Sequence, residues 1–184
     1  MAQLRAAERG DRVRYAACLA EQTALASGSI DLVTVAQAFH WFDRDAFYAE
    51  VDRVIAPGGV LAVVAYARLH TDRDIERAVH RFQDVTVGPY WTPQRQLVES
   101  GFAGIAIPIE EVEPPAFSIE AELTLSALLG YIGTWSAVGG YRQKVGQDPM
   151  PIVQRELEAR WGDPNTRRLV QWPLVVRAGR WKAL

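Results

Sequence analysis

The fold is decided by the stretch Ser29-Ile30-Asp31-Leu32-Val33-Thr34-Val35-Ala36, followed further along by Pro57-Gly58-Gly59 and the apolar run Val60–Tyr66. In the first stretch only Asp31 and Thr34 interrupt the apolar residues of 30–36, so apolar side chains fall on both faces. This pattern is typical of a strand that helices cover on both sides, as in a parallel sheet. The second run shows the same pattern and predicts a second strand.

A helix is expected between these two strands. Asp43 stands at the N-cap position, and Pro57-Gly58-Gly59 ends the helix. Its core face is predicted from the helical spacing of four apolar residues, Phe47, Val51, Val54 and Ile55. Strand, helix, glycine turn and strand in this order predict a right-handed βαβ crossover in a parallel sheet.

The flanking elements are less regular. Upstream, residues 3–9 are expected to end a helix, and Val13–Leu19 to form a short strand. Downstream, the expected helices are 72–85, 93–100, 118–130 and the helix that Pro151 opens, with Ile152, Val153 and Leu157 inward and Gly162 after its end. The expected strands are 102–112 and 168–180, where Pro108 and Pro173 indicate edge positions. One domain, 1–184, is predicted, with helical cover segments at about 70–100 and 118–162.

Composition excludes several classes of function. A formal net charge of -2 over 184 residues gives no electrostatic case for nucleic acid or an anionic membrane. The single cysteine, Cys18, excludes a disulfide framework and any CxxC site, and its apolar surroundings predict a buried thiol. No metal-ligand cluster, signal peptide or apolar run of membrane-spanning length is evident, so a cytoplasmic location is expected.

The predicted chemistry lies at the carboxyl end of the first strand, because ligands of open α/β sheets bind beyond the carboxyl ends of the strands. Gln37 offers an amide there, and His40 stands beside Trp41 just before a helix N-terminus. Phe39 and Phe42 are predicted to be core residues. His40 and Trp41 each keep two interpretations, a packed structural residue or a contact with a ligand.

At this point the sequence resembles a known family. The run from Ser29 to Asp43 looks like the central motif of class I S-adenosylmethionine-dependent methyltransferases, most closely the trans-aconitate methyltransferase branch. Further pieces match the same family in order and spacing: Ala20-Glu21, Ile55–Leu61, Tyr90-Trp91, Thr134–Ala137, Trp161–Asp163, Trp172–Leu174 and Arg177–Arg180.

The resemblance implies roles for individual residues. It places Ala20 and Glu21 beside the adenine of the cofactor, S-adenosyl-L-methionine, and Ala36, Gln37 and Ala38 beside its ribose and methionine part. It gives His40 the position of a general base, needed only if the acceptor must lose a proton. Contacts with a small-molecule methyl acceptor would come from four aromatic residues, Trp41, Tyr90, Trp91 and Trp135. For Tyr90, Trp91 and Trp135, hydrophobic packing is an equal interpretation.

The sequence also departs from the family. It contains no G-x-G run, whereas the family binds the methionine end of the cofactor on a glycine-rich turn after its first strand. The expected fold is therefore a Rossmann-like α/β sheet with helices on both faces that lacks the first two strands and this turn, as in an N-terminally truncated chain. Such a chain is expected to bind the cofactor poorly and to self-associate through an exposed sheet edge.

Two other classes of function remain open. A non-catalytic interaction module or remnant would explain the missing glycine turn, but the intact Gln37, His40 and Trp41 speak against it. A nicotinamide dehydrogenase would share the sheet but also needs a glycine turn.

Overall fold

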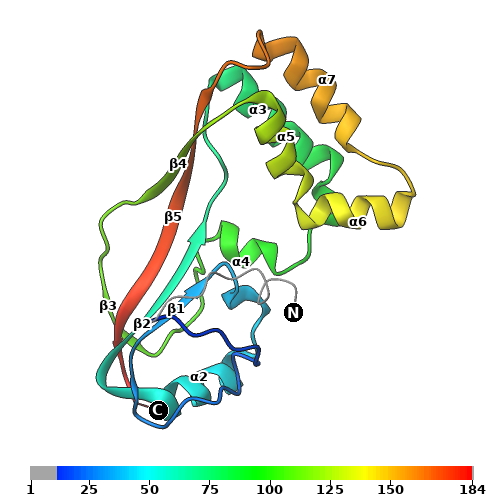
Figure 1. Cartoon of the computed structure of the whole chain (residues 1–184). Coiled ribbons are helices and arrows are strands. Elements are labelled where there is room, and N and C mark those ends of the chain that lie inside the picture. The colour runs from blue at the N-terminus through cyan, green and yellow to red at the C-terminus, as the bar shows by residue number, and fades with distance from the viewer. Residues whose placement is uncertain (1–11, 184) are drawn as a thin grey trace. The chain divides into compact units, whose positions relative to one another are not determined.

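The computed structural model describes residues 12–183 (Figure 1). They form two compact units: unit 1 contains 12–63, 106–113 and 177–183, and unit 2 contains 64–105 and 114–176. The strands are β1 (Ile30–Ala36), β2 (Ile55–Tyr66), β3 (Ile109–Val112), β4 (Ser118–Leu123) and β5 (Arg168–Trp181). The helices are η1 (Phe39–Trp41), α2 (Arg44–Val54), α3 (Arg73–Arg81), η2 (Phe82–Thr86), η3 (Gly88–Tyr90), α4 (Arg95–Glu99), α5 (Leu125–Gly133), α6 (Ser136–Val145) and α7 (Met150–Trp161).

The five strands form one sheet in the order β1-β2-β5-β3, and β4 pairs with β5 beside this path. Both β3 and β4 run antiparallel to β5. The prediction of an α/β sheet is confirmed in this general form. β1 and β2 are neighbours joined through α2, as expected for the crossover.

The segment β1–α2–β2 follows the sequence pattern closely. The Asp43 carboxylate accepts a hydrogen bond from the Ala46 N–H at 3.2 Å, which confirms the predicted cap. Three of the four residues predicted for the core face of the helix, Phe47, Val51 and Val54, lie in α2 and are buried. Ile55 is also buried but already begins β2, so Pro57-Gly58-Gly59 lies within the strand and does not end the helix. α2 runs directly into β2, where Gly58 takes a positive φ of 79°. A Cβ at Gly59 would come within 2.6 Å of the Ile55 side chain and 3.1 Å of the Ile30 carbonyl oxygen, so the close approach of β2 to β1 here favours glycine.

Three predictions for the region before and within β1 are wrong. β1 is not covered on both faces, since Val35 is its one buried residue and Leu32 is 54% exposed. The physical reason is its terminal place in the strand order, which leaves one edge unpaired among the described residues. Val13–Leu19 forms no strand and is exposed, and Cys18 is therefore exposed rather than buried. The helix expected at 3–9 lies outside the described residues.

The strand predicted at 102–112 is correct only for its last four residues, which form β3. Gly101 and Phe102 both take positive φ values, 63° and 59°, and two left-handed residues in succession end any extended run. β3 then pairs with β5 so that Glu111 lies opposite Gly179. A Cβ at Gly179 would collide with the Glu110 carbonyl oxygen, so glycine is required at this point of contact.

Unit 2 contains a helical core, in which α7 packs against both α3 and α5. The residues that are almost completely buried there include Val79, Leu128, Ile132, Val138, Val153, Leu157 and Trp161. The predicted α7 is confirmed, with Gly162 after its last residue at a φ of 79°. Ile152, however, is exposed, because the core face follows the stripe Val153, Leu157 and Trp161 at i, i+4 and i+8.

Two further predictions in unit 2 are corrected. The first half of the expected helix at 118–130 is strand β4, and α5 begins only after Thr124, whose hydroxyl accepts from the Ala127 N–H at 3.3 Å. Pro173 does not mark an edge strand, because β5 lies between β2 and β3. It stands opposite Ser118, the first paired residue of β4, so its missing N–H falls at the end of that ladder.

Candidate functional site

The candidate site begins where β1 ends. Gln37 takes a left-handed backbone conformation with φ 53°, which is uncommon for a residue with a Cβ. It turns the chain out of the strand and into η1, which carries the predicted His40 and Trp41. Backbone strain of this kind costs about 1–3 kcal/mol and persists where the surrounding structure enforces it.

The aromatic residues after this turn divide into a packed and an exposed group. Phe39 is buried and its ring lies 6.4 Å from that of Phe42 and 6.2 Å from that of Phe47, which confirms the core prediction for Phe39. Phe42 is only partly buried, because it borders a cavity. Trp41 is 56% exposed and its ring lies 4.8 Å from that of His40. Trp41 is therefore not a core residue.

A cavity of about 360 Å³ lies in unit 1 between the loop before β1, the strand itself and α2. Among the five residues predicted to bind the cofactor, Ala20, Ala36 and Ala38 line it, whereas Glu21 and Gln37 do not. The remaining lining residues are mostly apolar: Thr23, Leu25, Val33, Thr34, Val35, Phe42, Phe47, Glu50, Val51 and Val54.

Glu21 holds this loop to the start of α2. Its carboxylate accepts a hydrogen bond from the backbone N–H of Asp43 at 3.1 Å. An acidic group at a helix N-terminus also interacts favourably with the helix dipole. The structure thus gives Glu21 a contact within the fold, at the rim of the cavity.

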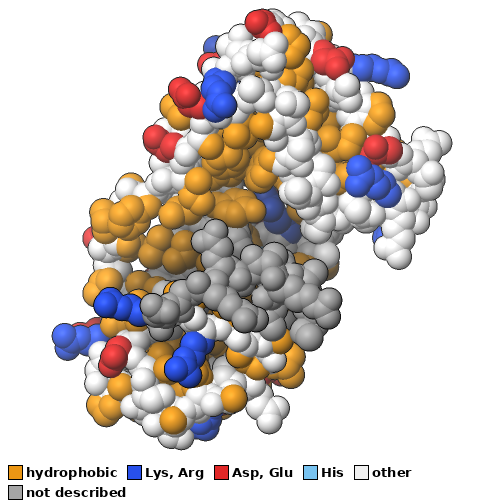
Figure 2. Space-filling view, viewed as in Figure 1, with side chains coloured by type: hydrophobic (Ala, Val, Ile, Leu, Met, Phe, Trp, Pro, Cys, Tyr) orange, Lys and Arg blue, Asp and Glu red, His pale blue; other side chains and the backbone are white. Residues whose placement is uncertain are grey.

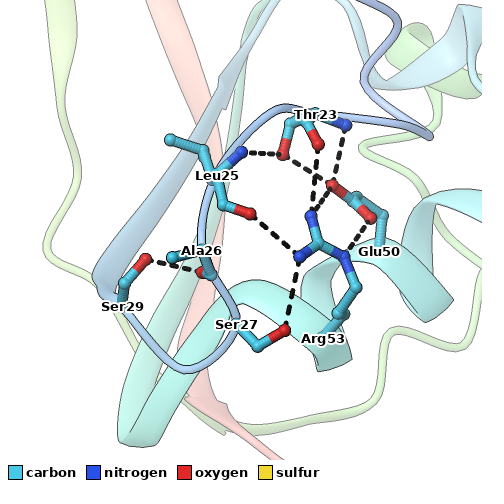
Figure 3. Close-up of polar contacts among 7 residues, drawn as sticks. All are labelled: Thr23, Leu25, Ala26, Ser27, Ser29, Glu50 and Arg53. Carbon is cyan, nitrogen blue, oxygen red and sulfur yellow. Dashed lines mark hydrogen bonds and ion pairs between the residues drawn. The ribbon is translucent and has the colours of Figure 1, made fainter.

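Glu50 and Arg53 form a second connection between the loop and α2 (Figure 3). One oxygen of the Glu50 carboxylate accepts from the Thr23 N–H at 2.7 Å and from the Thr23 hydroxyl at 2.6 Å. Arg53 donates to both Glu50 oxygens, at 2.7 and 2.9 Å, and to the carbonyl oxygens of Leu25 and Thr23, at 2.9 and 3.2 Å. We call Thr23, Glu50 and Arg53 the loop clamp.

The loop clamp changes the chemistry of its carboxylate. Hydrogen bonds from Arg53 and then from Thr23 lower the pKa of Glu50 to about 2. Glu50 is therefore ionised near neutral pH and its oxygens are occupied by donors, so it is no general base. Sequence reasoning missed the clamp; the i,i+3 spacing of Glu50 and Arg53 on α2 is the signal that indicates their ion pair.

The three remaining predicted residues lie in unit 2. The rings of Trp91 and Trp135 are 5.7 Å apart, and the Trp91 indole donates to the Gln83 carbonyl oxygen at 3.1 Å. The Tyr90 ring lies 4.9 Å from that of Tyr141. All three predicted residues pack against the helical core, so packing is a sufficient reason for their presence. Among residues 12–183, no group of three or more potential ligands could hold a metal ion, and no helix is long and apolar enough to cross a membrane.

Comparisons with known proteins identify the family. A family model described as a methyltransferase domain matches residues 1–63. The chain is 29% identical over 160 residues to a Dictyostelium discoideum protein provisionally named a methyltransferase, covering 84% of this chain and 60% of that protein. It is 39% identical over 89 residues to an uncharacterised methyltransferase of Mycobacterium tuberculosis, covering 44% of this chain and 37% of that protein.

A solved structure is also similar to this chain. It is that of a protein of Anaeromyxobacter dehalogenans that is provisionally named a type II methyltransferase. Its sequence is 42% identical to this chain, and the two structures superpose with a TM-score of 0.88. The match covers 97% of this chain and 76% of that one. The chain spans less than two thirds of the length of the two named relatives. On this evidence the chain belongs to the family of class I S-adenosylmethionine-dependent methyltransferases.

Proposed function

We propose that this chain forms the adenosine side of the cofactor site in a methyltransferase that acts on a small-molecule acceptor. One observation carries the proposal: the unit 1 cavity is lined by Ala20, Ala36 and Ala38, three residues that the family motif assigns to the cofactor. Ala20 precedes β1, whereas Ala36 ends that strand and Ala38 follows it, so the meeting of Ala20 with the other two at one cavity does not follow from sequence proximity.

The fit of the cavity to the cofactor is partial. Its volume of about 360 Å³ lies within the usual range for small-molecule pockets, and apolar walls with three alanines suit a flat adenine ring. The methionine end needs close backbone N–H donors, and no G-x-G run exists in the chain to supply them. The residues present therefore fit the adenosine part of the cofactor.

The residues of this chain would act mainly by positioning. Glu21 and the loop clamp hold the cavity rim against α2, and the turn at Gln37 directs His40 and Trp41 beyond the end of β1. When bound, the cofactor supplies an electrophilic methyl group on a sulfonium. His40 would remove a proton from an acceptor that carries one, and an acceptor that is already nucleophilic needs only orientation and exclusion of water. Trp41, Tyr90, Trp91 and Trp135 are proposed acceptor contacts, and the trans-aconitate branch is the proposed subgroup.

We also propose that residues 1–184 form a single domain that does not complete the cofactor site by itself. The exposure of β1 supports this part, because a strand whose apolar Leu32 and Ala36 are exposed lacks the cover that this family's sheet needs.

Titration of the chain with adenosine and with S-adenosylhomocysteine, followed by NMR, tests both parts. We expect millimolar binding of adenosine and no tighter binding of S-adenosylhomocysteine. The amino-acid end of S-adenosylhomocysteine needs close backbone N–H donors, which a glycine-rich turn would supply. Ala20→Leu should abolish binding by filling the cavity. Ala24→Leu, an exposed position on the same loop outside the cavity lining, is the matched control and should leave binding unchanged.

The outcomes separate the two parts. If Ala20→Leu binds adenosine as well as the control does, the cavity is not the adenosine site. If S-adenosylhomocysteine binds in the micromolar range, the chain completes the site alone and the second part of the proposal is wrong.

A non-catalytic interaction module is the second candidate. It is favoured by the exposed Leu32 and by the edge of β1 that has no partner within residues 12–183. Such a module is expected to self-associate by pairing this edge with a second copy. Sedimentation velocity over a hundredfold range of concentration tests it, and a monomer throughout would exclude this candidate.

A further inference from the structure

A second cavity lies wholly within unit 2 and has no role in the proposed function. Its volume is about 180 Å³, and its walls are Tyr66, Ile119, Tyr131 and Trp172. They come from four elements, β2, β4, α5 and β5. Figure 2 shows apolar side chains gathered in the part of the view where β4 and α5 lie.

The walls are arranged around a space for one ring. Ile119 and Trp172 are directly opposite each other on the paired strands β4 and β5. The Trp172 and Tyr131 rings lie 5.2 Å apart at 73°, an edge-to-face arrangement that leaves ring faces available. An apolar cavity of ~150 Å³ in another protein holds a benzene molecule, so this one has room for a single six-membered ring and a small substituent.

The hydrogen bonding of the Tyr131 hydroxyl determines what this cavity can offer to a ligand. The Trp172 indole N–H donates to the Tyr131 hydroxyl oxygen at 3.0 Å. Burial, and then the neighbouring Tyr66, raise the pKa of Tyr131, while hydrogen bonds from the Trp135 and Trp172 indoles oppose that rise. The hydroxyl therefore keeps its proton near neutral pH.

The direction of these bonds determines what the hydroxyl can offer. An indole nitrogen is a donor only, so the Trp172 indole uses a lone pair of the Tyr131 oxygen. Its own O–H remains available, and no acceptor for it is found among residues 12–183. The cavity thus combines mostly apolar walls with the Tyr131 hydroxyl as a hydrogen-bond donor.

We propose that this cavity binds a small neutral aromatic compound that presents a carbonyl or ether oxygen to the Tyr131 hydroxyl. A carboxylate or an ammonium group is disfavoured, because none of the four walls carries a charge to offset its desolvation. The inference is independent of cofactor binding, since every wall belongs to unit 2.

Titration of the chain with acetophenone, followed through its isoleucine methyl resonances, tests the proposal. We expect saturable, submillimolar to millimolar binding that shifts the Ile119 methyl signal. Toluene should bind through the ring alone, and benzoate should bind at least tenfold more weakly than acetophenone, because its charge would be buried unpaired.

Two variants make the test specific. Tyr131→Phe should weaken acetophenone about fivefold, the usual value of one net hydrogen bond, and change toluene binding less than about twofold. Tyr141→Phe, a tyrosine that packs on Tyr90 outside this cavity, is the matched control and should change neither. Ile119→Trp, at an exposed strand position, should fill the cavity and abolish binding of both compounds.

Any of three results would overturn the proposal. These are no methyl shift up to the solubility limit of acetophenone, equal losses of acetophenone and toluene affinity in Tyr131→Phe, or undiminished binding in a folded Ile119→Trp variant.

Discussion

β1 and β5 are both apolar in sequence, yet they differ greatly in burial. Among the described residues β1 pairs with β2 alone, and one of its seven residues is buried. β5 has fourteen residues and pairs with β2, β3 and β4, and only Leu169 and Arg180 along it are exposed. The difference shows that an apolar run predicts a strand, whereas its burial depends on how many neighbours the sheet provides.

The comparison extends to energetics. β5 begins beside α7, whose Trp161 is among the most buried side chains of the helical core, and β1 carries one side of an open cavity. Stability is therefore expected to be uneven, with large mutational effects near β5 and small ones on the exposed face of β1.

The largest expected effect is that of Trp161→Ala. Trp161 is 1% exposed, its indole donates to the Thr166 carbonyl oxygen at 3.0 Å, and the Arg168 guanidinium lies 5.2 Å from its ring centroid. Truncation should lower the free energy of unfolding by about 3–5 kcal/mol. Urea denaturation measures it, with the exposed Trp41→Ala as the matched control at less than about 1 kcal/mol. Equal losses in the two variants would remove the basis for the comparison.

A smaller, pH-dependent effect is expected from Glu50→Gln at the loop clamp. The folded pKa of Glu50 is about 2 against an ordinary 4.5, so the carboxylate stabilises the fold fully above about pH 5. This contribution is lost as the pH falls through 4.5 towards 2. The stability of the variant should therefore not show this loss between pH 4.5 and 2, and the stabilities of variant and wild type should converge near pH 2. Urea unfolding midpoints from pH 7 to 2.5 measure both.

The exposed Glu113→Gln serves as its control and should retain the wild-type profile. If Glu50→Gln also retains it, the clamp does not form in solution, and the loop that borders the unit 1 cavity is held by Glu21 alone.

The smallest effect is expected from Leu32→Ala on the exposed face of β1. With 54% of the residue exposed, the change in unfolding free energy should stay within about 0.5 kcal/mol, whereas Val35→Ala on the same strand should cost more than about 1 kcal/mol. Thermal and urea unfolding at two protein concentrations measure both. A loss for Leu32→Ala that equals that of Val35→Ala would mean that β1 is covered in solution, and a dependence on concentration would identify a second copy as the cover.

Local patterns in the sequence were sufficient for part of the fold. The helical spacing of Phe47, Val51 and Val54 predicted α2 and its buried face, and Asp43 predicted its cap. The same holds for α7 up to Gly162, apart from Ile152, which was predicted to be inward but is exposed. These elements depend on neighbours in sequence, and so local reasoning succeeds.

Elements that depend on distant partners were not predictable in this way. Residues 118–123 contain Glu, Ala and Leu, which favour helix, but pairing with β5 makes them a strand. Val13–Leu19 has strand composition but forms no strand, and Leu19 makes only an isolated bridge with Gln22. At the candidate site, the family motif led to Ala20, Ala36 and Ala38, whereas the loop clamp joins residues 27 to 30 positions apart and needed the structure.

The glycine at position 179 has a consequence for how the chain folds. β3 has only four residues, and its partners on β5 are far along the chain, with Glu111 and Arg177 66 residues apart. So short a ladder between distant segments closes late and could settle in a wrong register. A slip of one residue would bring Ala178 or Arg180 to the place of Gly179, and either Cβ would strike the Glu110 carbonyl. Only Gly179 fits at this position, so the steric clash of any other residue there disfavours a shifted register of β3 against β5.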